Sequence, residues 1–259
     1  MEKFLQSNYF LKEIGKINYN NKIVFCDIDG TIYRNSLFLD LLENLIEDGY
    51  ISQYKVAQYN KYKKKWKNRE IWYEEFLMYA VIDIFEKLIK TKKLHSSTFM
   101  KYTKKILKDN WKHILTYTMD TLKNLQNKWY KVVFISGSPL LMVKEFAKMY
   151  NFDIWLGTLL DKDKEWYYNW NCTVLASSES KEEIIKTILN EINPTHTISL
   201  WDTKWDLWML LITDIWVAIN PAAELYNAVK EEESILVIIE RKDLIIELDK
   251  KARQYIKNL

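Results

Sequence analysis

Two short apolar runs, each ending in small polar residues, constrain the fold of this chain more than any other feature. Residues 22–26 (KIVFC) and 131–135 (KVVFI) are nearly continuous apolar segments, typical of strands that are covered on both faces of a sheet. The first continues into DIDGT, and the second into SGSP and then a helical pattern. Strands that alternate with helices in this way predict a parallel sheet.

The rest of the chain extends this α/β pattern. Further strands are predicted at 152–156, 197–200, 215–219 and 235–239, a small hairpin at 159–176, and helices starting near Ser180, Lys204, Ala222 and Asp243. Residues 35–128 have helical periodicity, no proline and one glycine. We therefore predict a Rossmann-like, three-layer core formed by 1–34 and 118–259, with an all-helical cap, 35–117, inserted after the first strand. The cap is expected over the carboxyl edge of the sheet.

The composition predicts a soluble globular protein. The chain has 259 residues, a net charge of +3 and 48% hydrophobic residues, whereas disordered chains combine little apolar content with a large net charge. A membrane span needs roughly 18 consecutive apolar residues, and no such run is present. Two cysteines are too few for a disulfide framework. We expect a cytoplasmic protein without a membrane or nucleic-acid partner. The Tyr- and Lys-rich segment 54–67 is compatible with a nucleic-acid surface, but solvated helix faces explain it better.

Acidic residues follow two of the predicted strands. Asp27 and Asp29 come directly after the first strand, and Asp202 and Asp206 follow strand 197–200. Two carboxylates in one crevice repel each other unless a cation lies between them. Oxygen ligands favour a hard ion, and Mg²⁺ is the usual one where phosphate is also bound. A lone DxD is equally compatible with a turn or a helix cap.

Three further segments predict anion binding. The glycine at position 30 allows backbone N–H groups to turn toward an anion, and the Thr31 hydroxyl adds a donor. Ser136 and Gly137 repeat this arrangement after the second strand, although an ordinary strand-to-helix turn explains them as well. Lys181 lies near the start of a helix, the electrostatically unfavourable end for a cation. Either a nearby anion compensates its charge or it is a solvated surface lysine.

Together, these segments resemble the haloacid dehalogenase-like (HAD) hydrolases. DIDGT at 27–31, Ser136-Gly137, Lys181 and DTKWD at 202–206 stand in the order and approximate spacing of the four HAD motifs. The position of the helical insert is similar to that in the phosphoserine-phosphatase-like branch, subfamily IB. The resemblance covers nearly the whole chain. Ser36, however, stands where phosphoserine phosphatase has a substrate-binding glutamate, which argues against phosphoserine as the substrate.

The resemblance implies a role for each site residue. Asp27 would attack phosphorus and form an aspartyl-phosphate, while Asp29 would act as general acid and base. The phosphoryl group would be held by Ser136, Gly137 and Lys181, with Gly30 and Thr31 beside them. Mg²⁺ would be bound by the Asp27 carboxylate, the Asp29 main-chain carbonyl and Asp202, with Asp206 either as a further ligand or as a support for the ligands.

Tryptophan is unusually frequent in this chain and glycine unusually rare. There are 11 tryptophans and 5 glycines, whereas average usage of about 7% predicts roughly 18 glycines. Trp201 stands where the HAD motif has glycine, and Trp129 stands where a helix C-cap glycine is expected. One interpretation is that UGA codons read as glycine were translated as tryptophan; the other is a genuine aromatic core. The positions concerned are Trp129, Trp155, Trp166, Trp170, Trp201, Trp205, Trp208 and Trp216.

These observations predict a Mg²⁺-dependent phosphatase that hydrolyses a small phosphorylated metabolite. A phosphotransferase would use the same chemistry with another acceptor. If the tryptophans of the site are genuine and fill it, a catalytically inactive HAD-fold binding protein becomes the alternative.

Overall fold

A computed structural model describes most of the chain. The described residues are 1–17, 22–91, 93–173, 175, 178–204, 207, 212–241 and 244–248. Of the site candidates, Asp206 lies outside them, as do Trp205 and Trp208. Much of the helix expected from Lys204 also lies outside.

The strands form one eight-stranded sheet with the order β4-β3-β2-β1-β5-β6-β7-β8. Neighbouring strands from β3 through β7 pair in parallel, and β8 is antiparallel to β7. This arrangement confirms the predicted α/β, Rossmann-like fold. The strands are β1 (Lys22–Cys26), β2 (Tyr130–Pro139), β3 (Ile154–Lys162), β4 (Tyr168–Thr173), β5 (His196–Trp201), β6 (Ile215–Ile219), β7 (Ile235–Arg241) and β8 (Leu244–Glu247).

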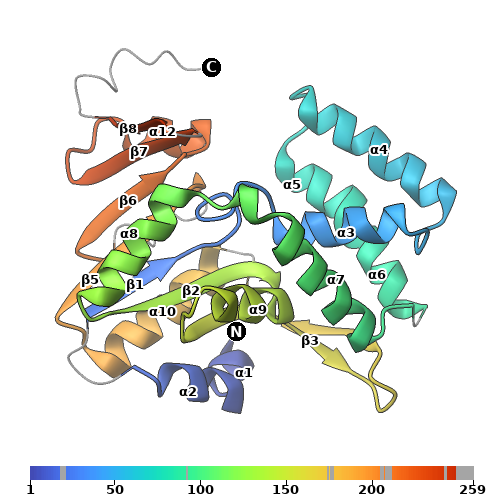
Figure 1. The fold of residues 1–259 in the computed structure, drawn as a ribbon, viewed down its shortest axis with the longest axis horizontal. Helices are drawn as coiled ribbons and strands as arrows, with labels where there is room; N and C mark the ends of the chain where they lie inside the picture. Colours follow the sequence, from blue (N-terminus) through green and yellow to red (C-terminus); the bar gives the residue numbers. More distant parts are fainter. Residues whose placement is uncertain are drawn as a thin grey trace. The chain divides into compact units, whose positions relative to one another are not determined.

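Helices pack against this sheet and also form a separate unit (Figure 1). In the core, α8 and α9 contact β2. The core helices are α1 (Glu2–Leu5), α2 (Asn8–Ile14), η2 (Trp111–His113, a 3₁₀-helix), α8 (Thr116–Asn127), α9 (Leu140–Met149), α10 (Ser178–Ile192) and α12 (Ala223–Val229). The others are α3 (Leu37–Glu47), α4 (Gln53–Lys67), α5 (Tyr73–Phe76), η1 (Leu77–Ile82, a π-helix), α6 (Asp83–Lys90) and α7 (Ser96–Asp109).

The position of β1 explains where the site forms. Residues 23–26 of β1 are 0% exposed, because the strand lies between β2 and β5 and is apolar on both faces. Cys26, its last residue, is in register with Phe134 of β2 and Leu200 of β5. The polar residues that follow these three positions therefore lie at the same edge of the sheet.

The chain divides into two compact units. The core unit comprises Met1–Ser36, Asn110–Thr158 and Thr173–Leu259, and the helical unit comprises Leu37–Asp109 and Leu159–Cys172. The predicted cap, 35–117, starts close to Leu37, the first residue of the helical unit, and runs past Asp109. It does not include the segment Leu159–Cys172, which the sequence assigns to the core.

This segment belongs to the hairpin formed by β3 and β4, and it packs on α7 within the helical unit. The rings of Phe99 and Tyr168 meet edge to face at 5.1 Å, and the amide of Ser96 donates to the carbonyl of Trp166 at 2.9 Å. Burial raises the pKa of Tyr168 to about 12. These contacts therefore tie this later segment to α7 within the helical unit.

Two element predictions were wrong in detail. The segment after Asp243 was expected to be helical, but Leu244–Glu247 forms β8 and pairs with β7. Its burial pattern is exposed throughout, so pairing with the neighbouring strand, and not its own apolar pattern, decides its conformation. The third strand was expected from Phe152 but begins at Ile154.

Two tryptophans adopt a backbone conformation that favours glycine. Trp129 has φ +68° and Trp166 has φ +66°, in the left-handed region that large side chains rarely occupy. Both side chains are exposed, at 86% and 62%. Because neither indole gains much from burial, packing does not explain why tryptophan stands at these two turns.

Within the described residues, no helix is both long and apolar enough to cross a membrane.

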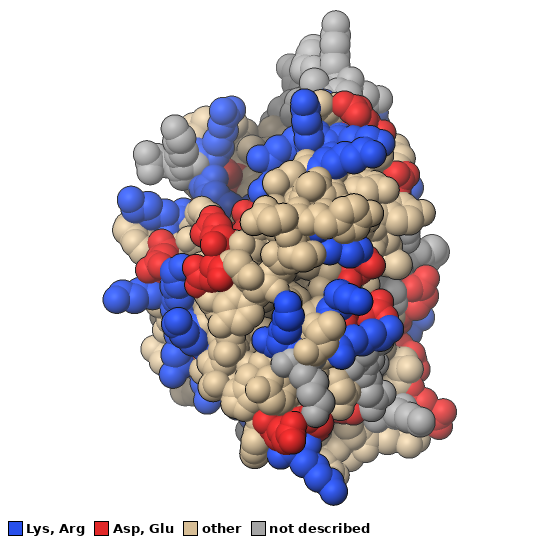
Figure 2. Space-filling model, turned by 90° about the vertical axis from the view of Figure 1, so that its right-hand side faces the viewer, with Lys and Arg blue, Asp and Glu red and all other residues tan. Residues whose placement is uncertain are grey.

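Basic and acidic side chains are interspersed over the face shown in Figure 2. In the lysine-rich α4, Lys55 is paired with Asp83 and Lys63 with Glu43. Part of the positive charge of this helix is thus compensated inside its own unit.

A carboxylate from β7 caps the start of α8. Glu240 is 3% exposed. Its Oε1 accepts a hydrogen bond from the Tyr117 amide at 3.0 Å, and its Oε2 accepts bonds from the Thr118 amide and hydroxyl, each at 3.2 Å. The side chain satisfies amides that lack partners at a helix start, and it fastens α8 to the sheet.

We expect Glu240→Ala to lower the free energy of unfolding by about 1 to 3 kcal/mol, because it leaves buried amides without an acceptor. Denaturant unfolding measures the change. Glu247→Ala, on the exposed strand β8, is the matched control and should have little effect. Equal losses in both variants would contradict the capping role.

Candidate active site

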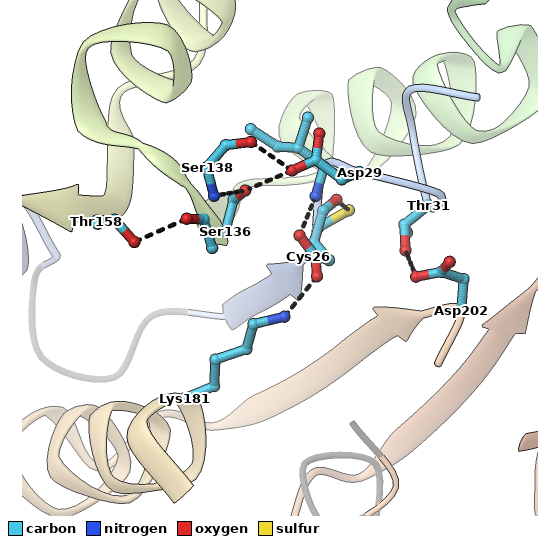
Figure 3. Close-up of polar contacts among 11 residues, drawn as sticks. Cys26, Asp29, Thr31, Ser136, Ser138, Thr158, Lys181 and Asp202 are labelled. Carbon is cyan, nitrogen blue, oxygen red and sulfur yellow. Dashed lines mark hydrogen bonds and ion pairs between the residues drawn. The ribbon is translucent and has the colours of Figure 1, made fainter. Parts of the chain in front are cut away.

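A buried ion pair lies at the end of β1 (Figure 3). Lys181 Nζ is 2.5 Å from Asp27 Oδ2, and the Ile28 amide donates to Asp27 Oδ1 at 2.6 Å. The side chains of Lys181 and Asp27 are only 7% and 9% exposed. Asp27 is therefore a preoriented carboxylate whose charge is balanced by a cation from the first turn of α10.

This pair decides between the two interpretations of Lys181. The residue as a whole is 5% exposed, so it is not a solvated surface lysine. The anion that compensates its unfavourable position at a helix start is the carboxylate of Asp27.

Asp29, two residues further on, is held by two hydroxyl groups from the end of β2. Asp29 Oδ2 accepts hydrogen bonds from Ser138 Oγ at 2.6 Å and from Ser136 Oγ at 3.2 Å. Both serines are buried. The structure thus brings Asp29 together with Ser136, one of the predicted site residues, and with Ser138, which was not predicted.

Asp202, after β5, lies against the loop that follows Asp29. Thr31 Oγ1 donates to Asp202 Oδ1 at 3.0 Å. A Cβ on Gly30, whose φ is +83°, would lie 1.9 Å from Asp202 Oδ2. Glycine suits position 30 for two reasons: its positive φ, and the Asp202 carboxylate, which would have to move to make room for a Cβ.

The amides of the loop do not act as the sequence predicts. The Gly30 amide donates to the Tyr33 carbonyl at 2.8 Å, and the Thr31 amide donates to the Ile28 carbonyl at 3.3 Å. These N–H groups close the loop on itself and are not turned toward an anion. Thr31 is 0% exposed, and its hydroxyl positions Asp202.

A hydrogen bond from β3 fixes the end of β2. Thr158 Oγ1 donates to the Gly137 carbonyl at 2.7 Å and accepts from the Leu175 amide at 3.1 Å. The sequence gives little indication of this role, because Thr158 lies in an ordinary strand pattern. Ser138 was detectable, because it belongs to the same SGSP segment as Ser136.

Charge is concentrated around Cys26. Burial raises the pKa of its thiol well above the ordinary value, the negative charges of Asp27 and Asp202 raise it further, and Lys181 lowers it. The protonated thiol is not a nucleophile. Because Asp27 and Asp202 both act on this thiol, their carboxylates lie near the end of β1, although the two residues are far apart in the sequence.

Trp201 is the last residue of β5 and lies next to the ion pair. Its side chain is 0% exposed, and its ring centroid is 4.9 Å from Lys181 Nζ. Its Nε1 is buried without a hydrogen-bond partner among the described residues. An unsatisfied buried donor costs about 1 to 3 kcal/mol, so the indole destabilises the site as it packs there.

The residue types at this edge of the sheet are those that a hard divalent cation prefers. Asp27 and Asp202 supply carboxylate oxygens from adjacent strands, and the absence of a Cβ on Gly30 allows Asp202 to approach the loop. Mg²⁺ prefers such oxygen ligands. Within the described residues, no group of three His, Cys, Asp or Glu side chains forms a metal site. The fourth predicted ligand residue, Asp206, is outside them.

We expect Gly30→Ala to lower the free energy of unfolding more than Gly49→Ala. Both glycines have positive φ, +83° and +75°, so each alanine carries strain of about 1 kcal/mol. Only the alanine at position 30 meets Asp202, whereas a Cβ at Gly49 has no atom within 4 Å. Denaturant unfolding of both variants measures the difference, and equal effects would show that Asp202 does not constrain this position.

No known protein family and no curated protein matched the chain. Several solved structures are similar to it. A protein with unknown function from Bordetella pertussis Tohama I has a TM-score of 0.64 at 11% identity, covering 82% of this chain and 95% of its own. A HAD family hydrolase from Salmonella enterica subsp. enterica serovar Typhi has a TM-score of 0.55 at 13% identity, covering 86% and 75%.

A substrate-bound phosphoserine phosphatase is also similar, with a TM-score of 0.56 at 16% identity, covering 92% of this chain and 99% of its own. At such identities the likeness concerns the fold. The structure thus confirms the fold that the motif order implied: this chain has the fold of the HAD hydrolases and phosphoserine phosphatases.

Proposed function

We propose that this protein is a Mg²⁺-dependent phosphatase that hydrolyses a small phosphomonoester through an aspartyl-phosphate at Asp27. The observation that carries the proposal is the buried pair of Asp27 with Lys181 at 2.5 Å, beside Asp29 with its two serine donors. A nucleophile, a cation for the phosphoryl group and a proton carrier are thus present at one edge of the sheet. The HAD fold of the chain supports the same assignment.

In the first step, a carboxylate oxygen of Asp27 attacks phosphorus as the bond to the ester oxygen breaks. Asp29 gives its proton to the departing oxygen. The electron pair of the broken bond goes to the leaving oxygen, and once the proton is transferred the negative charge is on Asp29; Lys181, beside Asp27, balances the charge of the phosphoryl oxygens during the transfer. The buried Ser136 hydroxyl and the turn at Gly137 supply further contacts to the phosphoryl oxygens.

In the second step, Asp29 takes a proton from water, the water oxygen attacks phosphorus, and the bond to Asp27 breaks. The products are inorganic phosphate and the regenerated Asp27 carboxylate. A phosphotransferase would differ only in that an acceptor hydroxyl replaces water.

The metal would be held by the carboxylates of Asp27 and Asp202 and by the main-chain carbonyl of Asp29. Asp206 would be a further ligand or would support the others. When bound, Mg²⁺ supplies charge neutralisation at the phosphoryl oxygens. Thr31 keeps Asp202 oriented for this role through its hydrogen bond.

A catalytically inactive binding protein is the alternative if Trp201 is genuine and fills the site. Against it, the indole lies beside Lys181 while the contact of Lys181 with Asp27 is retained. The catalytic pair is therefore compatible with tryptophan at this position.

We expect Asp27→Asn to lower turnover of 4-nitrophenyl phosphate at least about a thousandfold, because the amide cannot act as the nucleophile. Removal of divalent cations with a chelator should abolish turnover, and added Mg²⁺ should restore it. Asp120→Asn, an exposed position on α8, is the control and should retain activity. Equal activity of Asp27→Asn and the parent protein would refute the proposal.

We also propose that glycine is the natural residue at Trp129, Trp166 and Trp201. Trp129 and Trp166 have positive φ, and Trp201 has a buried, unpartnered Nε1 next to the catalytic pair. Glycine relieves each of these defects by itself: it adopts positive φ without strain, and it removes the indole. UGA codons read as glycine would account for all three positions.

The gene and the protein test this directly. UGA codons at 129, 166 and 201, with glycine at these positions in peptides of the native protein, are the expected result; UGG codons would refute it. In unfolding experiments, Trp166→Gly should raise stability by about 1 kcal/mol through relief of strain. Trp111→Gly is the matched control, since Trp111 is 60% exposed against 62% for Trp166 but lies in a 3₁₀-helix, where glycine should give no gain.

A further inference from the structure

Two serine hydroxyls donate hydrogen bonds of different length to the same oxygen of Asp29. Ser138 Oγ lies 2.6 Å from Asp29 Oδ2, whereas Ser136 Oγ lies 3.2 Å from it. Both serines are almost fully buried, at 2% and 0% exposure. Ser138 therefore makes the shorter hydrogen bond. Neither the motif order nor the proposed mechanism gives this serine a role.

Ser138 also orients Ser136. The Ser138 amide donates to Ser136 Oγ at 3.0 Å, which fixes one lone pair of that hydroxyl and leaves its proton for an acceptor. Ser138 thus contacts Asp29 through its hydroxyl and Ser136 through its amide. Among the described residues, no side chain caps α9, whose N-cap is Pro139, so the Ser138 hydroxyl serves Asp29 and not the helix.

We propose that Ser138 is the positioning residue for Asp29, and that this frees Ser136 to bind the phosphoryl group. The inference rests on the proposed phosphatase function. When the substrate binds, the longer bond from Ser136 is exchanged for a bond to a phosphoryl oxygen, while Ser138 keeps Oδ2 in place. The other oxygen, Oδ1, then carries the proton that passes to the leaving group as the bond from Asp27 to phosphorus forms.

A serine hydroxyl suits both halves of the reaction. It donates to Oδ2 in the carboxylate form of Asp29, and it still donates to Oδ2, then the carbonyl oxygen of the acid, when Oδ1 carries the proton. The contact therefore persists when Asp29 loses a proton to the leaving group and regains one from water. An alanine at position 138 removes this contact and allows the Asp29 side chain to rotate.

The experiment compares two substrates that differ only in the leaving group. Nitrophenolate departs without a proton, whereas the leaving oxygen of phenyl phosphate needs the general acid. Because general acid catalysis contributes about 10²- to 10⁴-fold, Ser138→Ala should lower kcat/KM for phenyl phosphate by about tenfold or more relative to its effect on 4-nitrophenyl phosphate. Ser138→Thr, which keeps the hydroxyl, should restore the ratio of the parent protein.

Ser136→Ala is the matched comparison. It should weaken inhibition by inorganic phosphate and leave the ratio between the two substrates close to that of the parent protein, whereas Ser138→Ala should change the ratio and leave phosphate inhibition nearly unaltered. Thermal unfolding of each variant identifies loss of structure, and the threonine variant provides the measurement if the alanine variant does not fold.

The outcomes distinguish a failure of the proposed role of Ser138 from a failure of the proposed phosphatase function. If the parent protein is active and Asp27→Asn is not, an unchanged ratio in Ser138→Ala, or equal losses on both substrates, overturns the role of Ser138 alone. Failure of Ser138→Thr to restore the ratio also overturns it. If the parent protein hydrolyses neither phosphate with Mg²⁺ present, the proposed function fails, and the role of Ser138 fails with it.

Discussion

The buried ion pair of Asp27 and Lys181 is the interaction on which the rest of the site depends. Two charges removed from water are tolerated only when they compensate each other, and the loss of one partner from such a pair costs about 3 to 5 kcal/mol. Lys181 comes from the first turn of α10 and Asp27 from the end of β1. The pair therefore fixes the position of α10 against the sheet, and the same requirement keeps a cation beside the carboxylate that acts as nucleophile in the proposed reaction.

The order of the strands brings the other groups to this pair. Because β1 lies between β2 and β5, the serines at the end of β2 and Asp202 after β5 meet the residues that follow β1. Thr31 and Asp202 are 171 positions apart, yet they share a hydrogen bond. Each group is held by a partner from another strand, so the parallel sheet, and not any one loop, sets the geometry of the site.

Prediction from the sequence succeeded where one local pattern was sufficient and failed where a partner decided the outcome. The apolar segment 22–26 has only one good solution, a strand covered on both faces, and β1 has those bounds. Leu244–Glu247 has no such pattern, and its pairing with β7 made a strand of a predicted helix. For the same reason the amides of Gly30 and Thr31 were assigned to an anion, although they bond within their own loop.

The sequence by itself determined the α/β fold, the order of the polar segments and the residue types that gather at the edge of the sheet. These follow from periodicity and spacing, which are properties of neighbouring positions. Only the tertiary structure decided that Lys181 is buried against Asp27, that Ser138 makes the short contact with Asp29, and that Trp201 packs beside the pair with its indole nitrogen unsatisfied. These facts depend on distances between distant parts of the chain, and no pattern of neighbouring residues contains them.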